Sequence, residues 1–350
     1  MNAPPLSDFG PLSNIGMIIS SVLGVFLIMS VGAFCRTRHW LTREADMSLA
    51  KITANVLLPA LFLDRILTDE TLGSLATAWT APALGFAFTA GGFIAAWFTA
   101  KWIGPWVGLV NDAQRRAFAV CAGICNYGYI PLPLAQIFYK QAEVDLIFHN
   151  VGVDLALWSV GIAIVSGGTA QASRLDRSRE PAKRSTFKKW SVQLLPALTS
   201  APLIAVATAV TIRSLGWETA IPDSVSRSIE MLADSSIPMG LLLSGAIIID
   251  FIKAADWTGA SRVIALSIGF RQCLMPIVML AVAGLLLTQT DLKQVLLLQA
   301  SMPSAVFPIV LVRLYHGDTA TALRVVLSTS IAGIVLIPLW MAIGAWWLGV

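Results

Sequence analysis

Charged side chains are scarce in this chain of 350 residues. Asp, Glu, Lys and Arg make up only 13% of the residues, hydrophobic residues make up 56%, and the mean hydropathy is +0.75. A soluble globular chain carries about 25% charged residues. The formal net charge of +4 does not indicate a nucleic-acid partner, because the basic residues stand in short segments between apolar runs. That arrangement is typical of the loops of a membrane protein.

Cysteine and histidine are also rare, with four and three residues in the whole chain. The cysteines lie in or beside apolar segments without paired spacing, so we expect no disulfide framework. Cys121 and Cys125 are four residues apart and share a helix face, and we interpret them as small packing residues rather than as a metal or redox site. The histidines stand far apart in the sequence and near the ends of the apolar segments. No zinc-protease, nucleophile-elbow or phosphate-loop motif is present. We therefore expect a protein that is not an enzyme, binds no cofactor and no metal, and is not driven directly by ATP.

Long apolar runs dominate the chain instead. A helix needs about 20 mostly apolar residues to cross a membrane. The predicted spans cover residues 14–36, 45–66, 75–100, 115–139, 144–167, 190–212, 229–250, 260–287, 292–314 and 322–348. We expect no cleavable signal peptide, because the residues before the first span contain no Lys or Arg. The predicted fold class is an all-α polytopic membrane protein with ten transmembrane helices.

The basic residues lie mainly on one side of these spans. One side holds 17 of the 24 Lys and Arg residues and the other side holds five. The richer side comprises Arg36, Arg38, Arg43, Lys101, Arg115, Arg116, Arg174, Arg177, Arg179, Lys183, Arg184, Lys188, Lys189, Lys253, Arg262, Arg313 and Arg324. Since basic loops stay in the cytoplasm, both termini are predicted outside the cell and the segment 169–189 inside it.

The basic linker 169–189 divides the chain into two halves, residues 1–168 and 190–350, with five predicted spans each. Five is an odd number, so the second half enters the membrane from the opposite side and the halves form an inverted repeat. The fourth span of each half is interrupted by prolines, namely Pro131 and Pro133 in one and Pro303 and Pro308 in the other. Broken helices at matching positions are typical of the binding sites of secondary transporters.

A broken helix within a membrane suits an anion for a physical reason. Proline removes a backbone N–H and clashes with the preceding turn, so Pro131 and Pro133 are expected to unwind a turn. The freed backbone groups must face protein or a wet cavity rather than lipid. The N-terminal ends of half-helices also favour negative charge. The alternative is that the prolines only kink two helices for packing.

Several short motifs resemble the auxin efflux carrier family, which includes plant PIN-type carriers and bacterial malate and malonate permeases. They are Gly32–Arg36, Leu49–Lys51, Leu57–Leu61, Asn126–Leu134, Leu298–Ala305, Tyr315–Asp318, Val325–Ser330 and Pro338. The resemblance extends over nearly the whole chain. It departs from the plant carriers at residues 169–189, which replace their long central cytoplasmic loop.

The resemblance implies a particular architecture and mechanism. Members have two inverted five-helix repeats in which helices four and nine are broken and cross at the substrate. They form homodimers whose spans one, two, six and seven are a scaffold, and the remaining spans move like an elevator. For this chain the resemblance implies a multi-pass protein of the bacterial inner membrane.

Residues around the two breaks are the predicted substrate ligands. Asn126 precedes the first break, and its amide matches an Asn that contacts the substrate carboxylate in PIN-type carriers; helix capping is the alternative. The predicted substrate-binding set is Asn126, Tyr127, Pro131, Pro133, Gln299, Ser301, Pro303 and Ser304. The two serines have an alternative role, because Ser often bonds to a carbonyl of its own helix. For Gln299 the alternative is hydrogen bonding within the helix bundle.

Polar residues inside other spans are the predicted supporting set, and each has an alternative. Asn150, Asp154 and Trp158 follow i, i+4, i+8 spacing and therefore share one helix face. Asp154 either carries a coupling proton or pairs with a buried base, since acids within membranes are rare and functional. Arg271 either balances a substrate anion or Asp154, or extends to the interface. Asn55 is expected to face the cavity, with Lys51 reaching the cytoplasmic side.

The function that these features predict is a secondary transporter of small organic anions, mono- or dicarboxylates, working by alternating access. Two alternatives remain: an exporter of auxin-like or other hydrophobic weak acids, and a channel-like pore. The expected partners are the anion, a coupling H⁺ or Na⁺, the lipid bilayer and a second copy of the chain, with no nucleic acid.

Overall fold

The computed structural model describes residues 11–69, 79–167 and 199–350, and over these ranges the chain folds into helices. Seven of the described helical segments are long and apolar enough to cross a membrane. They are Ile15–Thr37, Arg43–Thr68, Thr80–Trp102, Lys140–Ser166, Asp223–Ala254, Ser261–Leu286 and Thr319–Leu348. An eighth apolar helix, Ala201–Ser214, is shorter. The predicted all-α membrane fold is confirmed at this level.

Predicted spans four and nine are divided into shorter helices, so neither forms one long apolar helix. Predicted span six is described only from residue 199 onward, with its helix beginning at Ala201, and the predicted linker 169–189 lies outside the described residues. The other predicted spans each coincide with helical structure to within a few residues at the described ends. Long apolar runs fix helix positions well because a spanning helix satisfies all its backbone groups internally.

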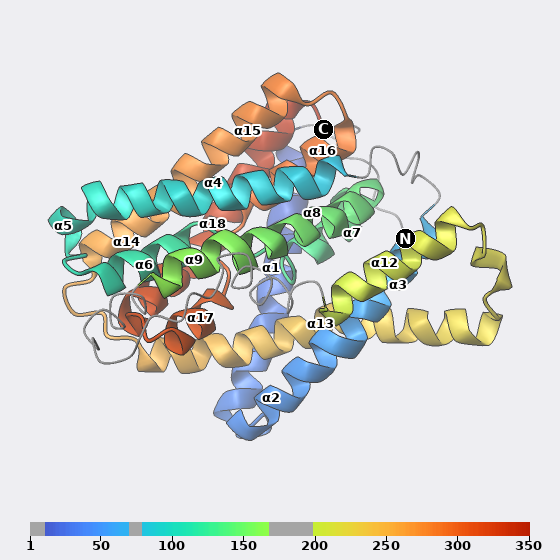
Figure 1. Ribbon diagram of the computed structural model, residues 1–350, viewed down its shortest axis with the longest axis horizontal. Coiled ribbons are helices and arrows are strands. Elements are labelled where there is room, and N and C mark those ends of the chain that lie inside the picture. The colour runs from blue at the N-terminus through green and yellow to red at the C-terminus, as the bar shows by residue number, and fades with distance from the viewer. Residues whose placement is uncertain (1–10, 70–78, 168–198) are drawn as a thin grey trace, which may run out of the picture.

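One group of helices forms around the long helix α13. Its members are α1 (Pro11–Thr37), α2 (Arg43–Ile52), the π-turn η2 (Thr53–Leu57), α3 (Leu58–Thr68), α12 (Ala201–Ser214) and α13 (Asp223–Ala254), with the short turn η5 (Glu218–Ala220) before α13. We call this the α13 group. Helix α1 crosses α13 steeply, and α3 lies beside α12 and α13 (Figure 1).

Small residues allow α1 and α13 to approach closely. A Cβ atom added at Gly245 would lie 1.8 Å from the Met29 carbonyl oxygen, and one at Gly32 would lie 2.0 Å from that of Leu242. No larger residue fits at either position without moving backbone, so glycine sets the crossing of these two helices.

A second, larger group packs around α4 and α18, and we call it the α18 group. Its helices in the first half are α4 (Thr80–Trp102), α5 (Gly104–Val107), α6 (Asp112–Ala122), α7 (Pro131–Phe138), η3 (Lys140–Ala142), α8 (Glu143–Ala156), η4 (Leu157–Gly161) and α9 (Ile162–Ser166). Those in the second half are α14 (Ser261–Ile268), η6 (Gly269–Leu274), α15 (Met275–Leu286), α16 (Thr290–Ser301), α17 (Pro308–Leu314) and α18 (Thr319–Leu348). Helix α4 lies along α8 and α6, and α18 packs on α14, α16 and α6 (Figure 1).

The two groups touch along a narrower boundary, where α1 and α13 meet α18, α1 meets α7, and α3 meets α8. Large apolar side chains cover the outside of both groups, including Leu27 in α1, Leu285 in α15 and Trp346 in α18, which are 66%, 77% and 80% exposed. Exposed apolar surface of this extent is typical of contact with lipid. Several exposed tryptophans stand near helix ends, as an interfacial aromatic belt requires.

Candidate functional site

The two interrupted spans meet at their interruptions. Backbone Asn126 N–H donates to the Pro303 carbonyl at 2.7 Å, and Ala305 N–H donates to the Ile124 carbonyl at 3.3 Å. Cys125 and Ser304 therefore face each other in an isolated antiparallel bridge. This pairing satisfies backbone groups that unwound helices would otherwise leave bare in an apolar interior. We call residues 123–130 and 302–307 the crossover.

The prolines take a different position from the one predicted. Pro131 and Pro133 do not lie in the unwound stretch; Pro131 is the first residue of α7, and Pro308 is the first residue of α17. Proline suits this position because the first N–H of a helix has no partner within the helix. The unwound residues precede Pro131. Pro303 does lie in the crossover, where its carbonyl accepts the bond from Asn126.

Gln299, one turn before the second break, connects three segments. Its Nε2 donates to Asn150 Oδ1 at 3.2 Å and to the Tyr127 carbonyl at 3.4 Å, and its Oε1 accepts from Cys125 Sγ at 2.8 Å. Because Gln299 is fully buried and both ends of its amide are occupied, it organises the crossover. The role of Cys125 was not predicted, since its thiol was interpreted as a small packing group.

Helix α8 supplies one wall of the crossover. Asn150 bonds Gln299, and Asp154 Oδ1 accepts from the Tyr127 hydroxyl at 2.6 Å. The Trp158 ring lies 6.2 Å from the Phe307 ring, measured between centroids. The structure confirms that Asn150, Asp154 and Trp158 share one helix face. Among the described residues Asp154 pairs with no basic side chain, so its partner is the neutral Tyr127 hydroxyl.

Arg271 is a buried cation directly behind the crossover. It is 1% exposed, so the alternative in which it extends to the interface is wrong. Its Nε donates to the Met302 carbonyl and its Nη2 to the Gln299 carbonyl, each at 3.1 Å. These are carbonyls at the C-terminal end of α16, where the helix dipole favours positive charge. Within the described residues no carboxylate pairs with Arg271, which excludes the predicted pairing with Asp154.

The two serines predicted as ligands differ in their hydrogen bonding. Ser301 Oγ donates to the Leu297 carbonyl of its own helix at 2.8 Å, which is the alternative role considered for it. Ser304 Oγ is buried and has no hydrogen-bond partner among the described residues. Its backbone N–H donates to Thr329 Oγ1 on α18 at 3.2 Å, so Thr329 holds the second break in place.

Asn126 and Asn55 also have different surroundings. Asn126 is half-buried in the crossover, and its side-chain amide forms no hydrogen bond within the described part of the chain. Asn55 is exposed on η2, and its Nδ2 donates to the Lys51 carbonyl of its own helix at 2.9 Å. The structure therefore does not bring Asn55 to the crossover, because its amide serves its own helix. Lys51 is exposed, as its predicted role requires.

A small space of about 10 Å³ adjoins the crossover. Its polar lining comprises Thr89, Cys125, His149 and Arg271. A volume of this size holds about one water molecule. His149 is 1% exposed inside α8, and neither ring nitrogen has a partner among the described residues. Its place in the first turns of α8 agrees with the predicted position near a span end, and its burial follows from the packing of α4 over His149.

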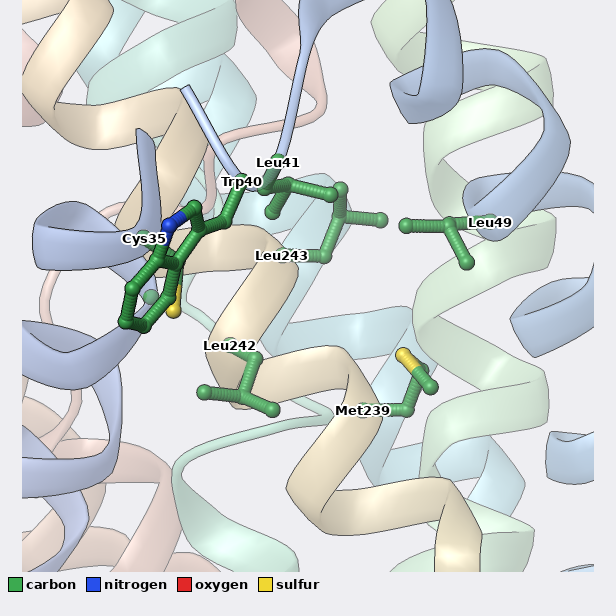
Figure 2. A pocket seen from close by; sticks show the side chains of 8 residues that line it. Cys35, Trp40, Leu41, Leu49, Met239, Leu242 and Leu243 are labelled. Carbon is green, nitrogen blue, oxygen red and sulfur yellow. The ribbon is translucent and has the colours of Figure 1, made fainter. Parts of the chain in front are cut away.

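A larger cavity of about 180 Å³ lies elsewhere, between α1, α2 and α13 (Figure 2). Its lining includes Cys35, Trp40, Leu49 and Met239, and it presents no charged side chain. An apolar cavity within the α13 group suits a hydrocarbon chain rather than a carboxylate. The crossover therefore combines the buried cation and the free polar groups, whereas the larger cavity has neither.

Comparison with known proteins gives this geometry its context. A family model described as a membrane transport protein matches residues 17–341, nearly the whole chain. The chain belongs to the membrane transport protein family. This is the auxin efflux carrier family that the sequence motifs resemble, so that prediction is confirmed. The membrane transport protein described here is also 22% identical, over 326 residues, to an uncharacterized transporter of Methanothermobacter thermautotrophicus. The match covers 92% of this chain and 97% of that relative.

Membership makes this chain a multi-pass membrane transporter, in agreement with its apolar helices. The family match includes both interrupted spans and the crossover between them. The substrate, by contrast, is named neither by the family nor by the relative, so it has to be argued from the crossover itself.

Proposed function

We propose that this transporter is a secondary carrier of small organic anions and that the substrate carboxylate binds at the crossover. The observation that carries the proposal is Arg271, a cation that is 1% exposed and has only backbone carbonyls as partners among the described residues. An unpaired buried charge is unfavourable in an apolar interior. Carbonyl dipoles compensate part of that charge, and an arriving carboxylate compensates the remainder.

Two polar groups without partners support the same assignment. The Asn126 amide and the Ser304 hydroxyl stand on opposite breaks and form no side-chain hydrogen bond among the described residues. Both are donors that a carboxylate can accept from. Helix α7 also begins at the crossover, and the N-terminal end of a helix favours negative charge. An anion therefore finds donors from both halves of the chain without an exposed Lys or Arg.

Asp154 is the group that we assign to ion coupling. Its carboxylate bonds the neutral Tyr127 hydroxyl and lacks a basic partner within the described chain, so binding a proton changes the charge of the crossover wall. A coupling Na⁺ is the alternative to H⁺. Uptake is measured with an imposed pH gradient alone and with an imposed Na⁺ gradient alone. The gradient that stimulates uptake identifies the coupling ion.

The proposal includes an alternating-access movement. In this scheme residues 1–168 and 190–350 are inverted five-span halves, and the α18 group moves relative to the α13 group. The division into two packing groups with a narrow boundary supports this scheme. Homodimer formation through the α13 group, and a bacterial inner-membrane location with both termini outside, belong to the same proposal.

Counterflow in proteoliposomes tests the function. Vesicles containing the purified protein are loaded with unlabelled malonate or malate, and entry of the labelled anion is followed. We expect saturable exchange that is lost in Arg271→Gln and Asn126→Ala. Asn55→Ala is the matched control, because that amide bonds its own helix and exchange should be retained. Flux without saturation, accompanied by single-channel currents, would indicate a pore instead.

One observation favours the second candidate function, export of a hydrophobic weak acid. Phe307 in the crossover is 42% exposed and lies against Trp158. Two neighbouring aromatic rings, tilted by 52° to each other, beside a carboxylate site suit an aromatic acid. Competition distinguishes the candidates: an aromatic acid that inhibits malonate exchange more strongly than succinate does would assign the site to hydrophobic acids.

A further inference from the structure

An ion-pair cluster lies on the boundary between the two helix groups. Arg65 belongs to α3 of the α13 group, and Glu143 is the first residue of α8 in the α18 group. Arg65 Nε lies 3.2 Å from Glu143 Oε1. Among the ion pairs of the described residues, this is the one that joins a helix of one group to a helix of the other. The contact is therefore placed where relative movement of the groups would break it.

The two partners depend on this contact to different extents. Arg65 also lies 2.9 Å from Asp64 Oδ2 and 3.6 Å from Asp234 Oδ1, both within its own group. Glu143 has one further partner, the neutral Gln136 of α7, whose Nε2 donates to Glu143 Oε1 at 2.8 Å. If the groups separate, Arg65 keeps two carboxylates. Glu143 keeps the Gln136 amide and no cation within ion-pair distance, and Lys140 acts on it only from farther away.

Because Glu143 is buried, the loss of its cation has a larger energetic effect than the loss of one carboxylate has on Arg65. Glu143 is 3% exposed and Asp64 is 8% exposed, whereas the Arg65 side chain is 25% exposed. A buried carboxylate that loses its cation is strongly destabilised. The contact is ionic without hydrogen-bond alignment, because Arg65 Nε lies 3.2 Å from Glu143 Oε1 and has no hydrogen-bond partner. When the contact opens, the remaining partners offset part of that destabilisation, since Asp64 and Asp234 stay beside Arg65 and Gln136 stays bonded to Glu143.

We propose that the Arg65–Glu143 pair is a latch between the α13 group and the α18 group, and that it holds the transporter in the arrangement of this structure until transport opens it. The latch rests on the proposed movement of one group relative to the other, and it does not depend on which anion is carried. Gln136 keeps Glu143 hydrogen-bonded while the latch is open.

A distance measurement without substrate tests the latch. Spin labels are attached to cysteines introduced at Ser228 of α13 and Ala163 of α9, which are exposed positions on the two groups. Cys35 and Cys273, the cysteines that are not buried, are replaced by serine beforehand. Pulsed dipolar spectroscopy then gives the distribution of distances between the groups. We expect one dominant distance in the parent protein.

The neutral pair Arg65→Gln with Glu143→Gln removes both charges of the latch, but it also takes the cation from the buried Asp64 carboxylate. Glu143→Gln alone is therefore measured beside it, because Arg65 then keeps Asp64 and Asp234, and it should change the distribution in the same way. We expect a second distance population, with the ratio of the two states changed about tenfold. Arg43→Gln is the matched control, because Arg43 pairs with Asp250 within the α13 group at 3.1 Å. That variant should leave the distribution unchanged.

The outcomes separate the latch from the transport proposal. An unchanged distribution in the folded neutral pair would overturn the latch, whatever the substrate. A changed distribution in the neutral pair, together with absence of saturable anion exchange in the parent protein, would support the latch and reject the anion proposal. A distribution that changes equally in Arg43→Gln would also overturn the latch, since any lost ion pair would then have the same effect.

Discussion

Replacing Arg271 with glutamine removes a buried positive charge while retaining an amide that can still donate to a carbonyl. The guanidinium donates to Met302 and Gln299, and each hydrogen bond from a charged group contributes about 1.5–3 kcal/mol. Desolvation of the cation opposes this and is several kcal/mol for a fully buried ion. Because the two terms are of similar size, we expect the melting temperature of the ligand-free protein to change little.

Anion affinity should respond quite differently. Removing one partner of a buried charge pair weakens binding by about 2 kcal/mol or more. That change corresponds to roughly a 30-fold increase in Kd. The structure therefore predicts a loss of binding that is separated from a loss of stability. Arg271→Lys should retain part of the affinity, because it keeps the charge but loses the planar fork that reaches both carbonyls.

Two assays on the same purified variants check this separation. Thermal unfolding without ligand reports the stability of the protein, and equilibrium binding of labelled malonate reports the affinity. The reasoning is refuted if Arg271→Gln binds the anion as tightly as the parent protein. A large drop in melting temperature with unchanged affinity would show that Arg271 only caps the C-terminal end of α16.

Other predictions concern the crossover and the helix crossings. Ser304→Ala should weaken anion binding, whereas Ser301→Ala should not, because the Ser301 hydroxyl already bonds its own helix; the two Kd values decide this. Tyr127→Phe removes the donor to Asp154, so the pH dependence of uptake should change, and an unchanged pH profile would remove Asp154 from coupling. Gly245→Ala should destabilise the protein by about 1–3 kcal/mol through overpacking against Met29. Gly91→Ala in α4, where the added methyl meets nothing within 4 Å, should not lower the melting temperature.

Much of the crossover could be anticipated from local sequence features. Asn150, Asp154 and Trp158 share a face because helical spacing requires it, and this face contacts both breaks. The positions of the two breaks also follow from prolines within apolar runs. Which residues are unwound was harder to predict, since Pro131 begins α7 and the unwound residues come before it. A proline in a sequence indicates a discontinuity but does not by itself say on which side of it the helix resumes.

The roles of several polar residues could not be predicted because their partners are distant in the sequence. Cys125 bonds Gln299, which is 174 residues away, and an apolar context gave its thiol only a packing role. The burial of His149 could not be predicted, because hydropathy does not show which face of α8 packs against α4. Arg271 had three possible roles in the sequence, and burial excluded one of them while the absence of a carboxylate partner within the described residues excluded another.

The sequence alone determined that the chain is a polytopic helical membrane protein, where its apolar segments lie, and which family it belongs to. These are local properties: a run of apolar residues is long enough to span a bilayer or it is not. Tertiary structure alone decided that Cys125 faces Ser304, that Arg271 holds the end of α16, and that Arg65 reaches Glu143. Those contacts join segments that are distant in the chain, so they depend on how whole helices pack rather than on the composition of any one of them.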